Sequence, residues 1–277
     1  MTDANDHDPT GGLDWRLAAC YTHCMDHHPV IVISGSPAWA EALPPLPGFA
    51  LVHYVDRAGY IARLVDDHAA LIVVDGHQPD WRAWVTTPKA SPATRRIPIA
   101  LVAADPATRA QGPIAGADFV LAPAEIATRL PEIACQHARI MPAEVRQRLS
   151  GQCAEPLPPQ ARQAVDLFNA GQYYRQHDLF EALWVAEQGP VRDLYRAVLQ
   201  VGVAYYQVTR GNRRGALKML LRSLQWLHVL PDVCQGIDVA RLRSDAQRLR
   251  EALEAWPTDD LAGFDLALLG QVHLVER

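Results

Sequence analysis

Short apolar runs alternate with longer alanine-rich segments over the first half of the chain. The runs are rich in β-branched residues and are apolar at successive positions, which predicts strands covered on both faces, as in a parallel sheet. We expect five such strands, at residues 30–34, 49–54, 70–75, 97–103 and 117–122. The intervening segments are suited to crossover helices, at residues 37–43, 57–67, 80–86, 106–112 and 124–138. Repeated strand–helix units predict a doubly wound α/β domain over residues 28–138.

The pattern changes after residue 138. Four prolines and Gly151 predict a linker over residues 139–159. Beyond it, glycines and prolines separate helical segments, which we place at residues 160–170, 173–188, 191–210, 213–230 and 239–255. These helices predict an all-α helical bundle over residues 160–256. Residues 257–277 form a tail that packs back as irregular structure, and residues 1–27 form a polar tail with a short helix.

Composition excludes several protein classes. A formal net charge of −5 provides no electrostatic attraction to nucleic acid or an anionic membrane. Apolar runs such as Val201–Tyr206 are far shorter than the roughly 20 residues that cross a bilayer. The cysteines are odd in number and scattered, and no secretion leader opens the chain, which predicts reduced thiols and a cytoplasmic location. These cysteines are Cys20, Cys24, Cys135, Cys153 and Cys234.

The third predicted strand ends in an acid. Asp75 closes it and Pro79 follows four residues later, while a Gly-Ala-Asp turn precedes the fifth strand. This pattern over residues 28–138 resembles the receiver domains of two-component systems. The resemblance implies a flavodoxin-like (receiver-like) α/β domain in which Asp75 stands at the phosphoacceptor position.

The groups that support phosphoryl transfer are missing from the matching positions. The resemblance implies an acidic pair after the first strand to hold a divalent cation, a hydroxyl after the fourth and a lysine after the fifth. The sequence instead has Ser34-Gly35-Ser36, Ala103 and Ala122 at these positions. We therefore expect a pseudo-receiver in which Asp75 is a degenerate phosphoacceptor position that takes no phosphoryl group.

A dense motif follows in the helical half. Residues 160–255 resemble the helical family known as domain of unknown function 309, through Phe168, Asn169, Gly171, Tyr173, His177, Glu181, Trp184, Gln200, Arg210, Gly211, Asn212, Gly215 and Ala216. The resemblance implies a helical bundle and no settled activity. Two departures are Asp178, where relatives often have Glu, and Gln207, close to where relatives can offer a His.

His177, Glu181 and Trp184 stand at i, i+4 and i+7, so they share one helix face, which we expect to point inward. Three interpretations stay open. The first is a buried polar network, in which His177 bonds to Glu181 or a tyrosine hydroxyl and the Trp184 indole N–H is satisfied. The second is a metal site at His177 and Glu181. The third is a small-molecule pocket with a His–carboxylate general base, lined by Tyr173, His177, Glu181, Trp184 and Tyr206.

A second possible metal site lies near the start of the chain. Cys20 and Cys24 share a helix face with His23 and His27 adjacent, and these are the residue types that bind zinc. A further ligand pair with finger-like spacing is absent from the sequence. The cofactor therefore stays unknown, and we expect none.

Together these patterns favour a non-catalytic regulatory or scaffolding protein. A phosphorylation-incompetent receiver-like domain would be joined to the helical bundle and act by protein–protein contact. Its partner would be another protein or a second copy of the chain in a homo-oligomer, and neither nucleic acid nor a membrane. The alternatives are a metal-dependent hydrolase using the His177/Glu181 face and a small-molecule sensor using the same pocket.

Overall fold

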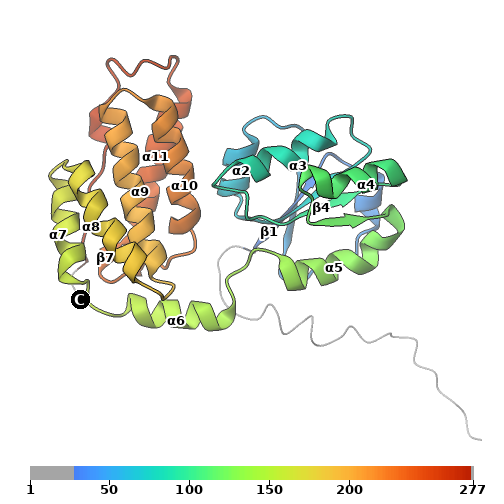
Figure 1. The fold of residues 1–277 in the computed structure, drawn as a ribbon, viewed down its shortest axis with the longest axis horizontal. Coiled ribbons are helices and arrows are strands. Elements are labelled where there is room, and N and C mark those ends of the chain that lie inside the picture. Colours follow the sequence, from blue (N-terminus) through green and yellow to red (C-terminus); the bar gives the residue numbers. More distant parts are fainter. Residues whose placement is uncertain (1–27, 276–277) are drawn as a thin grey trace, which may run out of the picture. The chain divides into compact units, whose positions relative to one another are not determined.

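The structure, a computed structural model, describes residues 28–275 (Figure 1). The chain forms two compact units, one from residues 28–60 and 69–140 and one from residues 61–68 and 141–275. In chain order, we describe residues 28–140 as the α/β unit and residues 141–275 as the helical unit. The metal site predicted at Cys20 and Cys24 and the predicted N-terminal helix lie outside the described residues.

The α/β unit is built on one parallel sheet. Its strands are β1 (Val30–Ser34), β2 (Ala50–Tyr54), β3 (Ala69–Asp75), β4 (Ile99–Val102) and β5 (Phe119–Leu121). They pair side by side in the order β2-β1-β3-β4-β5, and every pair is parallel. The five strands predicted from the apolar runs are thus confirmed.

Helices cover both faces of this sheet, as the doubly apolar strands require. The helical elements are η1 (Ala38–Ala42), α2 (Tyr60–Asp66), α3 (Trp81–Ala90), α4 (Pro106–Ala115), η2 (Pro123–Glu125) and α5 (Ile126–His137). Figure 1 shows α5 on one side of the sheet and α3 and α4 on the other. Alternate residues of β1 and β3 (Ile31, Ile33, Leu71 and Val73) join buried residues of α5 in one core cluster.

The helical unit contains the five predicted helices and one more. They are α6 (Ala143–Cys153), α7 (Pro159–Asn169), α8 (Tyr173–Ala186), α9 (Arg192–Thr209), α10 (Arg213–Leu227) and α11 (Val239–Ala255). Helix α9 packs against both α8 and α10, and most of its residues are buried. No helix among residues 28–275 is both long and apolar enough to span a bilayer.

Helix α6 corrects the predicted linker. The prolines that suggested a linker stand just outside it, because Pro142 precedes its first residue and Pro159 opens the next helix. Only Leu149 and Cys153 of α6 are buried, so the sequence shows little helical periodicity of apolar residues. The linker prediction is therefore wrong over residues 143–153.

A small hairpin, which the sequence pattern did not predict, precedes α11. It joins β6 (Val233–Cys234) to β7 (Ile237–Asp238) through Gln235 and Gly236, whose φ angles are 50° and 81°. Positive φ at both central residues is the geometry of a tight two-residue hairpin turn. Each strand has only two residues, which is too short for a period of two to be recognised.

The C-terminal segment packs back on the helices, as predicted. Leu274 forms a β-bridge with Ile237, after the short helix η3 (Leu266–Leu268). The side chain of Asn169 binds both backbone groups of Val272, with its Nδ2 donating to the carbonyl at 2.9 Å and its Oδ1 accepting from the N–H at 2.8 Å. This pairing assigns a structural task to the motif residue Asn169.

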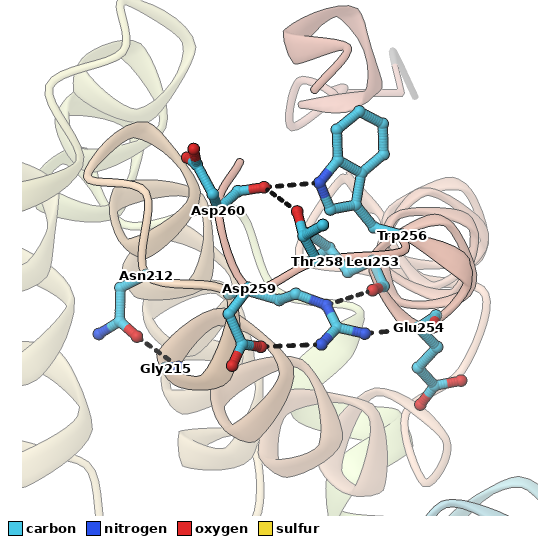
Figure 2. A network of polar contacts seen from close by, with 9 residues as sticks. Asn212, Gly215, Leu253, Glu254, Trp256, Thr258, Asp259 and Asp260 are labelled. Atoms are coloured by element: carbon cyan, nitrogen blue, oxygen red, sulfur yellow. Dashed lines mark hydrogen bonds and ion pairs between the residues drawn. The ribbon is translucent and has the colours of Figure 1, made fainter. Parts of the chain in front are cut away.

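Arg213 at the start of α10 fixes the end of α11. Figure 2 shows three residues that it contacts, Leu253, Glu254 and Asp259. Its Nε donates to the carbonyl of Leu253 at 2.7 Å, and its Nη2 donates to that of Glu254 at 3.2 Å. Its Nη1 forms an ion pair with Asp259 at 3.0 Å. The guanidinium thus satisfies carbonyls that the end of a helix leaves unpaired.

Candidate functional site

The carboxyl end of β3 places Asp75 at the edge of the sheet, where ligands bind in open α/β folds. Asp75 is 8% exposed, and its backbone N–H donates to the hydroxyl of Ser34 at 2.9 Å. Its Oδ1 accepts from the backbone N–H and the ring Nδ1 of His77, both at 3.1 Å. A carboxylate can only accept, so the pairing fits the tautomer with hydrogen on Nδ1. The side chain of Asp75 therefore stabilises the loop that follows β3 by binding His77.

The neighbouring strand ends bring small, uncharged residues to this edge. Ser34, at the end of β1, is fully buried, and Ala103 follows β4. A Cβ on residue 76 would lie 2.7 Å from the Cβ of Ala103, so the loops that follow β3 and β4 are close-packed at Gly76. Ala122 follows β5, and its N–H donates to Glu125 at 2.7 Å.

Lys89 is the lysine of the α/β unit, and it lies away from this edge. Its ammonium group pairs with Asp118 at 2.7 Å and donates to the carbonyl of Ile97 at 3.2 Å. Asp118 also accepts from the N–H of Ile99, at the start of β4. Because strands β3 and β4 run parallel, with Asp75 paired to Val102 at the end of β4, the start of β4 lies at the opposite edge of the sheet from Asp75.

In the helical unit, α8 turns a different face inward from the one predicted. Gln176 and Phe180 are fully buried, whereas Glu181 is exposed and His177 is partly exposed. The ring Nδ1 of His177 lies 3.3 Å from a carboxylate oxygen of Asp178, its neighbour in sequence. The expected inward face is therefore wrong. The polar network that paired His177 with Glu181 or a tyrosine hydroxyl is not formed among the described residues, because His177 pairs with Asp178. The buried face of α8 is centred on Phe180, the apolar residue that precedes Glu181 in the chain, and Glu181 itself points away from the core.

Trp184 lies against a cation. The guanidinium carbon of Arg196 is 4.9 Å from the centre of the Trp184 ring and 4.2 Å from that of Trp226. Trp184 lies on α8, Arg196 on α9 and Trp226 on α10, so these cation–π contacts join the three helices. The indole N–H of Trp184 is buried and has no acceptor among the described residues, so the prediction that it is satisfied is wrong.

The tyrosines of the predicted pocket are separated. Tyr173 packs edge-on against Tyr205 in the core, with ring centres 5.6 Å apart, and burial raises the pKa of its phenol. Tyr206 is 37% exposed and lies beside the exposed Tyr174 instead, with ring centres 6.4 Å apart. The predicted pocket of Tyr173, His177, Glu181, Trp184 and Tyr206 thus combines partly buried residues with exposed ones. No group of three or more His, Cys, Asp or Glu residues that could hold a metal occurs between residues 28 and 275.

Two buried glutamines were not picked out as site residues by the sequence analysis. Gln176 and Gln200 are 0% and 6% exposed, and the Oε1 of each lacks a hydrogen-bond partner within the described part of the chain. The Nε2 of Gln176 donates to the carbonyl of Tyr173 at 2.9 Å. Gln200 belongs to the motif, yet a single sequence does not distinguish a buried glutamine from a solvated one.

The cysteines of the helical unit correct another prediction. Cys153 and Cys234 form a disulfide, although the sequence predicted reduced thiols. They stand 81 residues apart in the chain, at the end of α6 and in β6, so their proximity depends on the fold. Cys135 takes no part in this bond.

Comparison with known proteins agrees with the helical resemblance. The family described as Domain of unknown function (DUF309) matches residues 161–219, which confirms the motif found in this half of the chain. No receiver-domain family matches the chain. An uncharacterized protein of Aquifex aeolicus (strain VF5) is 23% identical over 84 residues, which are 30% of this chain and 25% of the relative. The chain thus matches a quarter of the length of that relative.

Proposed function

We propose that the protein is a non-catalytic regulatory or scaffolding protein of the cytoplasm, which acts by contact with another protein or a second copy. In this proposal, a receiver-like domain that takes no phosphoryl group is joined to the helical unit. The strand order β2-β1-β3-β4-β5 supports it, because flavodoxin-like folds use the same order.

The surroundings of Asp75 are the observation that carries the proposal. Transfer of a phosphoryl group to a carboxylate depends on cations that stabilise the developing charge, and this contribution amounts to several kcal/mol. Ser34, Ala103 and Ala122 stand at the positions that would supply the cation ligands, the hydroxyl and the positive charge, in that order. Asp75 instead binds His77, which occupies one of its oxygens.

Exposed apolar side chains on both units support contact as the output. On α4, Ile114 is 86% exposed, and Val55 just after β2 is 74% exposed. On the helical unit, Tyr174 and Tyr206 contact each other at the surface. Aromatic side chains that are already held together lose little conformational entropy when a partner covers them.

Titration of the full chain with Mg²⁺, followed by calorimetry, tests the loss of the cation site. We expect no saturable heat in the millimolar range in which carboxylate sites hold this ion. The Asp75→Asn variant should give the same flat trace as the wild-type chain. Saturable binding that disappears in Asp75→Asn would contradict the proposal, because it would show that the edge still assembles a cation site.

A further inference from the structure

The disulfide joins the first helix of the helical unit to the hairpin before its last helix. Cys153 is the final residue of α6, and Cys234 belongs to β6. Cys234 is fully buried and Cys153 is 5% exposed. The bond therefore closes a long loop that contains α7, α8, α9 and α10.

Helix α6 has few other attachments. Of its 11 residues, only Leu149 and Cys153 are buried. Its C-terminal end forms hydrogen bonds through two residues. The backbone N–H of Gln235 donates to the carbonyl of Cys153 at 2.8 Å, and its Nε2 donates to the carbonyl of Gln152 at 3.4 Å. The Oε1 of Gln152 accepts from the N–H of Val191 at 3.1 Å, and its Nε2 donates to Oε1 of Glu187 at 3.5 Å. An element with so little buried apolar surface opens locally at low free-energy cost. The disulfide is the covalent restraint that holds the C-terminal end of this helix to the hairpin.

We propose that the Cys153–Cys234 disulfide is a redox-controlled clasp on α6. While the clasp is closed, residues 141–142 alone separate Ile140, the last residue of the α/β unit, from the docked helix α6. When a dithiol reductant opens it, α6 leaves the bundle and residues 141–158 become the connection to α7. The redox state then sets the length of the free connection between Ile140 and α7, which is a means of controlling contact with a partner.

The chemistry is thiol–disulfide exchange with a protein dithiol of the thioredoxin class. The reductant's thiolate attacks Sγ of Cys153, which is the less buried of the two cysteines. The S–S bond breaks, and the Cys234 thiolate leaves and takes up a proton. The second thiol of the reductant then displaces Cys153 from the mixed disulfide. The reductant loses two electrons and becomes a disulfide, while Cys153 and Cys234 gain them as two thiols. Local opening of α6 provides access to the bond.

The full-length chain can be compared in its two redox states by hydrogen exchange and limited trypsin digestion. Arg146 and Arg148 provide cleavage sites within α6. We expect the reduced chain to exchange α6 amides and to be cut at these sites roughly tenfold faster or more, because protection follows local stability. Amides of α9 should stay protected in both states, which shows that the bundle remains folded.

Two variants complete the test. Cys234→Ser should behave as the reduced chain under oxidising and reducing conditions alike. A chain with Cys20, Cys24 and Cys135 replaced by serine should keep the full response, because it retains both cysteines of the clasp. Equal α6 protection in the oxidised and reduced chains would overturn the proposal. So would a Cys153 thiol that stays open to alkylation after oxidation, and a simultaneous loss of α9 protection would show a structural bond instead of a clasp.

Discussion

The side-chain amide of Gln176 on α8 fills the space in which a Cβ of residue 202 on α9 would lie, so the two helices meet where only glycine fits. Phe168 of α7 closes the same position, because that Cβ would lie 3.2 Å from its ring. Gln176 is completely buried, and its Nε2 is bound to the carbonyl of Tyr173. It therefore cannot swing into solvent to make room.

This contact predicts the effect of Gly202→Ala. The added methyl group should lower the free energy of unfolding by about 1–3 kcal/mol, as overpacking of a core does. Gly151→Ala is the matched control, since Gly151 lies within helix α6 and a Cβ there would meet nothing within 4 Å. In urea titrations, Gly151→Ala should raise the free energy of unfolding by at most about 1 kcal/mol.

A double variant separates this contact from a general effect of the substitution. Gln176→Ala removes the side chain that the new methyl group would strike. Gln176→Ala/Gly202→Ala should therefore be more stable than the sum of the two single changes indicates. Additive effects, or a Gly202→Ala variant as stable as Gly151→Ala, would contradict the close approach of α8 and α9.

Arg213 should not be replaceable by lysine. Its fork contacts the carbonyls of Leu253 and Glu254 and the carboxylate of Asp259 at once (Figure 2), which a single ammonium group cannot reproduce. We expect Arg213→Lys to lower the free energy of unfolding by about 1–2 kcal/mol in urea titrations. The exposed neighbour Arg214 serves as control, and Arg214→Lys should stay within about 0.5 kcal/mol of the wild-type value. Equal free energies of unfolding for Arg213→Lys and Arg214→Lys would contradict the role of Arg213 at the end of α11.

Tyr205 should make the free energy of unfolding fall as the pH rises above 10. Burial raises the pKa of its phenol above the unfolded value of 10.0, so its neutral form stabilises the fold below pH 10 and this contribution is lost as pH rises further. Tyr205→Phe removes the oxygen that accepts from the N–H of Gly270, which should cost about 0.5–1.5 kcal/mol at neutral pH. In urea titrations, the difference in free energy of unfolding between the wild-type chain and Tyr205→Phe should shrink above pH 10. A difference that stays constant with pH would refute the role given to the Tyr205 phenol.

Much of the architecture follows from local pattern. The strands of the α/β unit are buried on both faces, so their apolar runs stand out in the sequence. Helix ends such as Gly211 and Asn212 carry their signal in residue type, since Gly211 has a φ of 71° and Asn212 accepts from the N–H of Gly215. Helix α6 and the β6–β7 hairpin bury too few residues to leave such a signal.

The candidate sites were harder to predict because they depend on tertiary contacts. A spacing of four residues places His177 and Glu181 on one face, yet it does not say whether that face or the adjacent Gln176/Phe180 face meets α9. The Cys153–Cys234 pair is formed by residues far apart in sequence, so no local pattern announces it. The absence of charge at the strand ends around Asp75 could be predicted, because residues at the carboxyl ends of parallel strands meet at one edge.

Incubation of the full chain with acetyl phosphate and Mg²⁺, followed by intact-mass measurement, tests the central claim most directly. A phosphorylation-competent receiver protein in the same buffer serves as positive control. We predict that the mass of this chain stays unchanged while the control gains one phosphoryl group. A Mg²⁺-dependent gain of one phosphoryl group that is lost in Asp75→Asn would contradict the account and show an active phosphoacceptor.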